Sequence, residues 1–173
     1  MIRDLDYLLE HVVACLNGPS EEASFGYGNQ DALMKWLENK NKNSINRFLN
    51  VPNSKKYPLI WLVEGWEGVN VVSGIEYRNI TFHFSVNSNI PALNEDRKPQ
   101  FEMLFDVANK FIEQLKFSGV KVLPNLEFTK RANFLVSQNE NTIDVWDTVI
   151  LRTELLLNTN CIKRIISGAC GAS

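Results

Sequence analysis

Two pairs of residues in this sequence have side chains that could take part in catalysis. His83 and Ser85 lie two positions apart in an alternating stretch, so a strand would place both on one face, as a base and a nucleophile require. The bases of two such side chains are roughly 6–7 Å apart on a strand, and no GxSxG motif surrounds Ser85. Glu64 and Glu67 could act as an acid and a base, but glycines bound their segment and it contains no histidine or lysine. We therefore predict no catalytic residues.

Two other patterns could bind a metal ion or a phosphate. His11 and Cys15 are four residues apart on a predicted helix, which would suit two metal ligands, although Cys15 is more simply explained as a small core residue. Gly26 and Gly28 could cradle a phosphate, but no GK[ST] follows them and no apolar strand precedes them, so a turn with two aromatic residues is expected. The three cysteines have no CxxC spacing. No metal, cofactor or disulfide framework is predicted.

The composition is that of an ordinary globular protein. The chain has 173 residues, a formal net charge of -2, 45% hydrophobic residues and 22% charged residues. These values suit one domain and exclude wholesale disorder. The weak acidity does not provide the basic face that nucleic-acid binding requires, and no apolar stretch approaches the ~20 residues of a membrane-spanning helix. The composition predicts a soluble cytosolic protein.

Two amphipathic helices are predicted from apolar residues that recur every three or four positions. The first covers residues 2–16 and presents Ile2, Leu5, Leu8, Leu9, Val12, Val13 and Leu16 on one side. The second covers residues 99–117, between Pro99 and Gly119, and presents Phe101, Leu104, Phe105, Ala108, Phe111, Ile112 and Leu115. Its three phenylalanines suggest that it lies across a broad sheet. A short third helix capped by Asp31 is expected, followed by an exposed loop or frayed helix end over Asn39–Asn50.

Four strands are predicted. One follows Pro58 and ends at Val63, and another over residues 79–87 alternates between apolar residues and a polar, solvated face that carries His83 and Ser85. The last two form a long hairpin with arms Leu126–Val136 and Ile143–Leu157. The second arm would span roughly 50 Å at ~3.3 Å per residue, which exceeds the width of a domain of this size. Part of the hairpin is therefore expected to project and to need a partner that covers it.

These elements predict an α+β fold. A mostly antiparallel sheet is packed by the N-terminal helix and one long central helix, and it ends in the long C-terminal β-hairpin. Residues 1–157 form a single domain, and the small, glycine-rich tail of residues 158–173 is expected to be ordered by neighbouring subunits.

The order of the elements resembles that of the tail-terminator and tail-completion proteins of bacteriophages, which are small α+β subunits that close into rings at the head-proximal end of a tail. The resemblance covers residues 1–157 and is carried by Phe25-Gly26-Tyr27-Gly28-Asn29, Tyr57-Pro58-Leu59-Ile60-Trp61-Leu62, and Ile80–Val86 leading through Asn94-Glu95-Asp96 to the helix at 99–117. It implies a structural protein of the virion, located at the head–tail neck or in the proximal tail, that is present in host cytoplasm during assembly. It also implies a ring of six or twelve copies, contacts with neck, tail or portal-associated proteins, and DNA that passes through the lumen without sequence-specific binding. The family has no catalytic residues to transfer.

The hairpin is the predicted contact between subunits. Its residues combine aromatic or aliphatic anchors with a charged rim, as protein interfaces do: Phe128 and Phe134 on the first arm, and Trp146, Ile150, Arg152 and Glu154 on the second. Two alternatives remain open. One is a non-viral adaptor module that binds through the sheet face around Trp61 and Trp66. The other is a small hydrolase-like enzyme that uses His83, Ser85 or the pair of Glu64 and Glu67.

Overall fold

The computed structural model describes residues 5–17, 23–45, 57–88, 93, 95–135 and 145–158. The elements are α1 (Leu5–Leu16), β1 (Ser24–Gly28), α2 (Gln30–Ile45), β2 (Leu59–Val63), β3 (Glu67–Val71), β4 (Gly74–Asn87), α3 (Lys98–Phe117), β5 (Val120–Val122), β6 (Glu127–Leu135) and β7 (Val145–Leu157). The fold is α+β, as predicted. Of the expected C-terminal tail, only Asn158 lies within the described residues.

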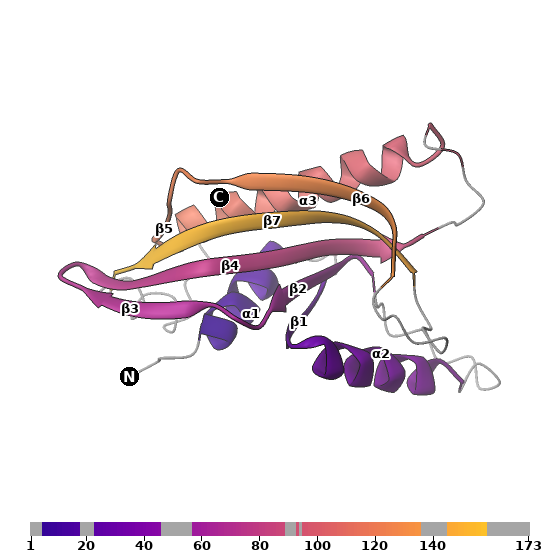
Figure 1. The fold of residues 1–173 in the computed structure, drawn as a ribbon, viewed down its shortest axis with the longest axis horizontal. Coiled ribbons are helices and arrows are strands. Elements are labelled where there is room, and N and C mark those ends of the chain that lie inside the picture. The colour runs from indigo at the N-terminus through magenta and orange to yellow at the C-terminus, as the bar shows by residue number, and fades with distance from the viewer. Residues whose placement is uncertain are drawn as a thin grey trace.

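A seven-stranded sheet forms the centre of the molecule (Figure 1). Its strand order is β1-β2-β4-β7-β5, with β3 added to β4 and β6 added to β7. The β1–β2 pair is parallel and every other pair is antiparallel. The strands β6 and β7 are consecutive antiparallel partners, as the predicted hairpin requires.

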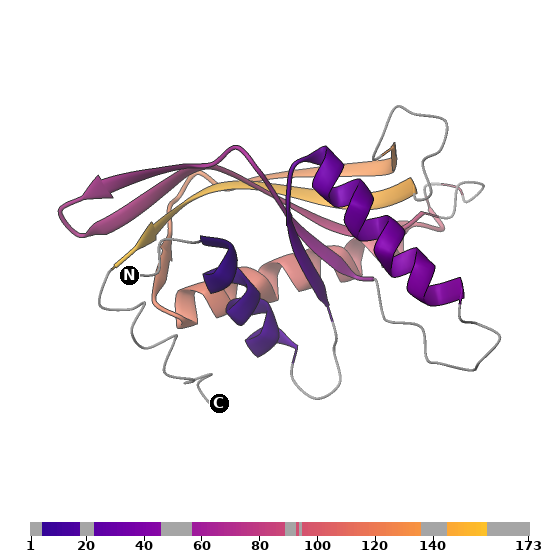
Figure 2. The same cartoon turned by 90° about the horizontal axis from the view of Figure 1, so that it is seen from below.

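Part of the β6–β7 hairpin was expected to project beyond the core, but the described part of its second arm does not. β7 is a central strand, because β4 is similarly long and pairs with it from Ile75↔Leu157 to Asn87↔Trp146. The part of the sheet that extends past the helices is instead the β3–β4 hairpin (Figures 1 and 2).

α1 and α3 cover one face of the sheet (Figure 2). The predicted stripes of both helices are buried there, apart from Leu16 and Phe105, which are partly buried, and Ile2, which lies outside the described residues. They pack against the apolar side of β2, β4 and β7, which includes Ile60, Phe82, Phe84 and Leu151. α3 has Pro99 in its first turn, and Gly119, with a φ of 82°, follows its end as predicted.

α2 covers part of the opposite face, beside β2. Its residues Leu33 and Leu37 form a second apolar cluster with Leu59, Trp61 and Trp146. The helix has 16 residues and extends into the segment expected to be a loop or a frayed helix end. Asn29, rather than Asp31, caps it, since the Asn29 side chain accepts a hydrogen bond from the Ala32 N–H at 3.0 Å.

The segment expected to be an aromatic turn is strand β1. It pairs in parallel with β2 over its whole length, from Ser24↔Leu59 to Gly28↔Val63. Glycine is needed at position 26 because a Cβ atom there would lie 2.5 Å from the ring of Trp61. Gly26, one of the two glycines that suggested a turn, therefore allows a tryptophan ring to pack against a strand.

Candidate assembly surface

The six predicted interface residues separate into a buried group and a more accessible group. Trp146 and Ile150 are buried inside the chain itself, with exposed fractions of 0% and 5%. Phe134 and Glu154 are half-buried, whereas Phe128 and Arg152 are exposed. The structure therefore leaves Phe128 and Arg152 as the predicted residues that are most accessible to a second molecule.

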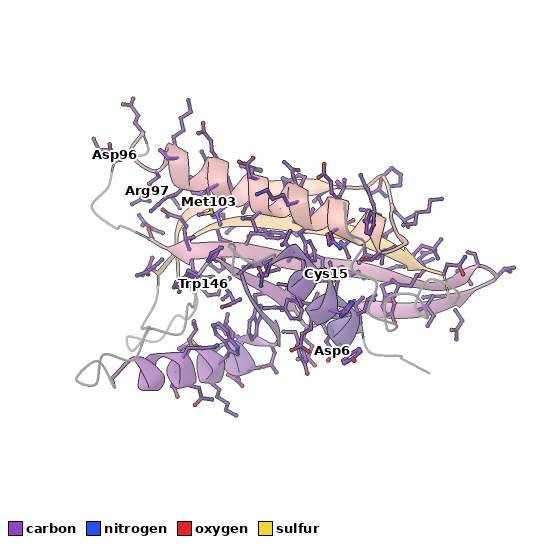
Figure 3. The ribbon with its side chains drawn as sticks, turned by 180° about the vertical axis from the view of Figure 1, so that it is seen from behind. Asp6, Cys15, Asp96, Arg97, Met103 and Trp146 are labelled. Atoms are coloured by element: carbon purple, nitrogen blue, oxygen red, sulfur yellow. The ribbon has the colours of Figure 1, made fainter. Side chains whose placement is uncertain are left out.

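The expectation that Trp146 is an outward-facing anchor is wrong. Its side chain lies on the face of the sheet that α2 covers, and its indole N–H donates a hydrogen bond of 2.7 Å to the Tyr57 hydroxyl (Figure 3). Strand alternation correctly places Trp146 on the face opposite the α1–α3 core. A second helix covers that face at this end of the sheet, so the indole belongs to the fold.

His83 and Ser85 do not form a nucleophile–base pair. The Ser85 hydroxyl is buried and donates to Thr148 Oγ1 at 2.9 Å, and Thr148 in turn donates to the Phe84 carbonyl at 3.1 Å. The His83 ring contacts the rings of Phe134 and Trp146, with centroid distances of 5.4 and 6.5 Å. This part of the polar face is therefore largely buried, which corrects the expectation that it is solvated.

Burial, together with the nearby cations of Arg131 and Arg152, lowers the pKa of His83 to about 4. The imidazole is consequently neutral at pH 7. The described groups that act on the imidazole are aromatic rings and cations, which do not orient it as a general base in the way that a carboxylate does.

The two glutamates and the cysteine that were considered for catalysis or metal binding do not form a site in the described part of the chain. Glu64 follows β2 and Glu67 begins β3, and both side chains are exposed to solvent. Cys15 is disulfide-bonded, whereas the cysteine spacing had predicted no disulfide framework, and this bond removes its thiol as a metal ligand. Among the described residues, no group of three or more His, Cys, Asp or Glu side chains is arranged to hold a metal ion.

The sheet face proposed for an adaptor module is not presented either. Trp61 is 3% exposed, packs against Trp36 of α2 and donates a hydrogen bond to the Gly28 carbonyl. Trp66 is half-buried against the core on the α1–α3 side. The two indoles therefore belong to different clusters and share no exposed face.

Sequence reasoning missed a buried ion pair where α3 begins. Arg97 Nη1 lies 3.6 Å from Asp147 Oδ1, and both side chains are almost completely buried. Figure 3 shows Arg97 where α3 begins. The same carboxylate oxygen accepts hydrogen bonds from the Ser88 hydroxyl and the Asn133 N–H. The sequence does indicate that Asp147 needs a partner. Asp147 alternates with Trp146 and therefore lies on the apolar side of β7, where a lone carboxylate requires a counter-ion or a hydrogen-bond donor.

β6 provides an exposed strand edge. Among the described residues it pairs only with β7, so its outer edge carries backbone groups that no described strand satisfies. Phe128 is 38% exposed and contacts Phe105 of α3 on one side, whereas Glu127 and Arg131 lie on the other. Glu127 forms a 3.8 Å ion pair with Arg152.

β3 provides a second exposed edge, because it pairs with β4 on the side opposite β7. It pairs only with β4 within the described chain, and all of its residues except Val71 are exposed. Sequence reasoning assigned its first residues to a loop because of Gly65 and Gly68. The segment Val69–Ile75, in which β-branched residues flank Ser73-Gly74, is the signal that could have identified the hairpin.

A polar cleft of about 400 Å³ lies where the pairing of β4 with β7 is irregular. It is lined by Asn79, Ile80, Thr81, Asn125, Glu127, Arg152, Thr153 and Glu154. Glu127 and Arg152 form an ion pair at its border, and Glu154 leaves the lining with one more carboxylate than cations. The cleft therefore has no excess of positive charge to hold an anionic substrate.

None of the helices in the described part of the chain has both the length and the apolar character needed to cross a membrane. No family model matches this chain, and no curated protein is significantly similar to it.

Proposed function

We propose that this protein is a structural subunit that assembles with copies of itself into a ring at the head–tail junction of a bacteriophage. The observation that carries the proposal is a sheet with two unlike exposed edges, β3 on one side and β6 on the other. A subunit with two different contact surfaces binds its neighbours head to tail, and such contacts form a closed ring when the rotation between neighbours closes.

The character of the two edges supports assembly. An exposed strand that is long and carries apolar side chains is an aggregation hazard unless another chain covers it. β6 has nine residues and presents Phe128 at its surface, and the β3–β4 hairpin presents Val69 and Val72. Covering both edges in a closed ring would remove the hazard from every subunit at once.

The sequence resemblance supports the location in a virion. The element order on which it rests is an N-terminal helix, a polar excursion, two or more strands, a long helix and a hairpin. By this resemblance the ring has six or twelve copies and contacts neck, tail or portal-associated proteins. DNA passes through its lumen, and the slight negative charge of the chain would not retain it.

Catalysis is not part of the proposal. The most reactive combination in the sequence, His83 with Ser85, is engaged in ring contacts and in a hydrogen bond to Thr148. The protein would instead act by its shape, either by terminating a tube or by joining two rings of different symmetry.

Immunoelectron microscopy tests the proposed location. Antibodies against the purified chain are applied to phage particles whose genome encodes it. We expect label at the head–tail junction of each particle, with preimmune serum as the control. Intact particles from which the protein is absent by both labelling and mass spectrometry would contradict the proposal.

A further inference from the structure

The tip of the β3–β4 hairpin, residues 67–76, has the character of a surface that another molecule covers. Its strand β3 is exposed on both faces, and Val72 at the turn is fully exposed, with Val69 on the strand also exposed. Turns normally carry Gly, Asn, Asp, Ser or Pro, so a solvent-exposed valine at a turn has no local structural role. The hairpin also extends past the helices (Figures 1 and 2).

The β6 edge offers a matching surface on the other side of the sheet. Its nine residues could accommodate the five residues of β3, which are about 17 Å long at ~3.3–3.4 Å per residue. The exposed side chains of Leu126 and Phe128 lie at its beginning and provide an apolar contact for a valine.

The charges of the two surfaces are opposite. The segment 64–78, which includes the hairpin, carries three carboxylates, Glu64, Glu67 and Glu76, against the single guanidinium of Arg78. β6 and the adjacent Arg152 carry three cations, Lys130, Arg131 and Arg152, against the single carboxylate of Glu127. Opposite charges on two surfaces favour their association and fix its direction.

We infer that the β3–β4 hairpin of one subunit docks on the β6 edge of a second copy and extends its sheet by one strand. Added strands of this kind bind through main-chain hydrogen bonds and gain specificity from alternate side chains. Every copy has one hairpin and one β6 edge, so each subunit is at once donor and acceptor. The inference rests on the proposed self-assembly, because it names the surfaces that join neighbouring copies.

Charge reversal tests this pairing. Glu67→Lys and Arg131→Glu each place like charges in contact, and we expect each variant to associate at least about tenfold more weakly than wild type in sedimentation velocity. The double variant restores opposite charges, and we expect its association to return to within about threefold of wild type. Glu113→Lys is the matched control, because it makes the same chemical change on the exposed side of α3. Circular dichroism verifies that each variant is folded.

Hydrogen exchange on the wild-type chain provides a measurement that needs no substitution. We expect amides of Val69, Asn70 and Val71 that point away from β4 to exchange at least about tenfold more slowly in the assembled protein than in the dilute monomer. A wild-type chain that assembles without this protection, and whose association is unaffected by both reversals, would overturn the inference and leave the proposed ring intact. A wild-type chain that never assembles would contradict the proposed function itself.

Discussion

His83 couples the stability of the folded chain to pH. Burial and the cations of Arg131 and Arg152 lower its pKa to about 4, whereas the unfolded chain binds the same proton with a pKa near 6.5. Between these two values the unfolded state holds more protons than the folded state. The free energy of unfolding therefore falls as the pH decreases through this range.

We expect the His83 contribution to reduce the free energy of unfolding by about 2 kcal/mol between pH 7 and pH 4.5. Urea titrations at the two pH values measure the loss, and His83→Gln is the control because glutamine does not titrate. The variant should lose less stability than wild type over this range. Parallel losses in the two proteins would show that His83 does not titrate as its surroundings indicate.

Trp146 and Arg152 lie on the same face of β7 and should respond oppositely to substitution. Trp146→Glu places a carboxylate in a fully buried apolar cluster and removes the hydrogen bond to Tyr57, so we expect a loss of at least about 4 kcal/mol and an unfolded chain. Arg152→Ala removes an exposed ion pair with Glu127 and should change stability by less than about 1 kcal/mol. Thermal unfolding followed by circular dichroism distinguishes the two. A folded Trp146→Glu monomer would contradict the burial of the indole.

At the scale of elements, the Arg97–Asp147 ion pair attaches the beginning of α3 to β7. Removing one partner leaves a buried charge without its counter-ion, so Arg97→Met and Asp147→Asn should each cost about 3 kcal/mol. The double variant leaves neither charge, and its cost should be clearly less than the sum of the two. Urea unfolding of the four proteins provides the coupling energy. Additive losses would show that the two side chains act independently.

The elements that could be predicted from the sequence are those whose apolar residues have a clear period. The stripe of α3 and the alternation of β4 each bury one side of an element, and that requirement is visible in the residue types. The sequence predicts β1 and α2 less accurately than it predicts α3 and β4. Gly26 of β1 is required by the ring of Trp61, whereas Gly28 is required by its φ of 132° and by the Ala32 side chain. α2 is polar over much of its length.

The candidate site was predictable only in part for a related reason. Alternation shows which side chains share a face, but it does not show what covers that face. Trp146 and Arg152 share one face of β7, yet α2 covers only the end that carries Trp146. Phe128 and Arg152 were predicted as interface residues, and both are exposed. The β3 edge was not predicted, because it belongs to a hairpin whose first strand contains a glycine and follows another.

At the scale of the whole molecule, the two exposed edges differ in length, charge and side chains. That asymmetry favours head-to-tail contacts over a symmetric dimer, in which the same surface would contact itself. The helices of the described chain lie on the faces of the sheet, and no described helix covers the outer edge of β3 or of β6. This architecture suits the proposed subunit, in which β3 is the donor edge and β6 is the acceptor edge.

The mass of the purified full chain in solution tests the central claim most directly. Sedimentation equilibrium over a range of micromolar concentrations, at low and at moderate salt, measures it without labels. The account predicts a single closed species of six or twelve times the 19.8 kDa monomer, which weakens as salt screens the complementary charges. A mass that remains 19.8 kDa at every concentration, or that stops at a symmetric dimer, would contradict it.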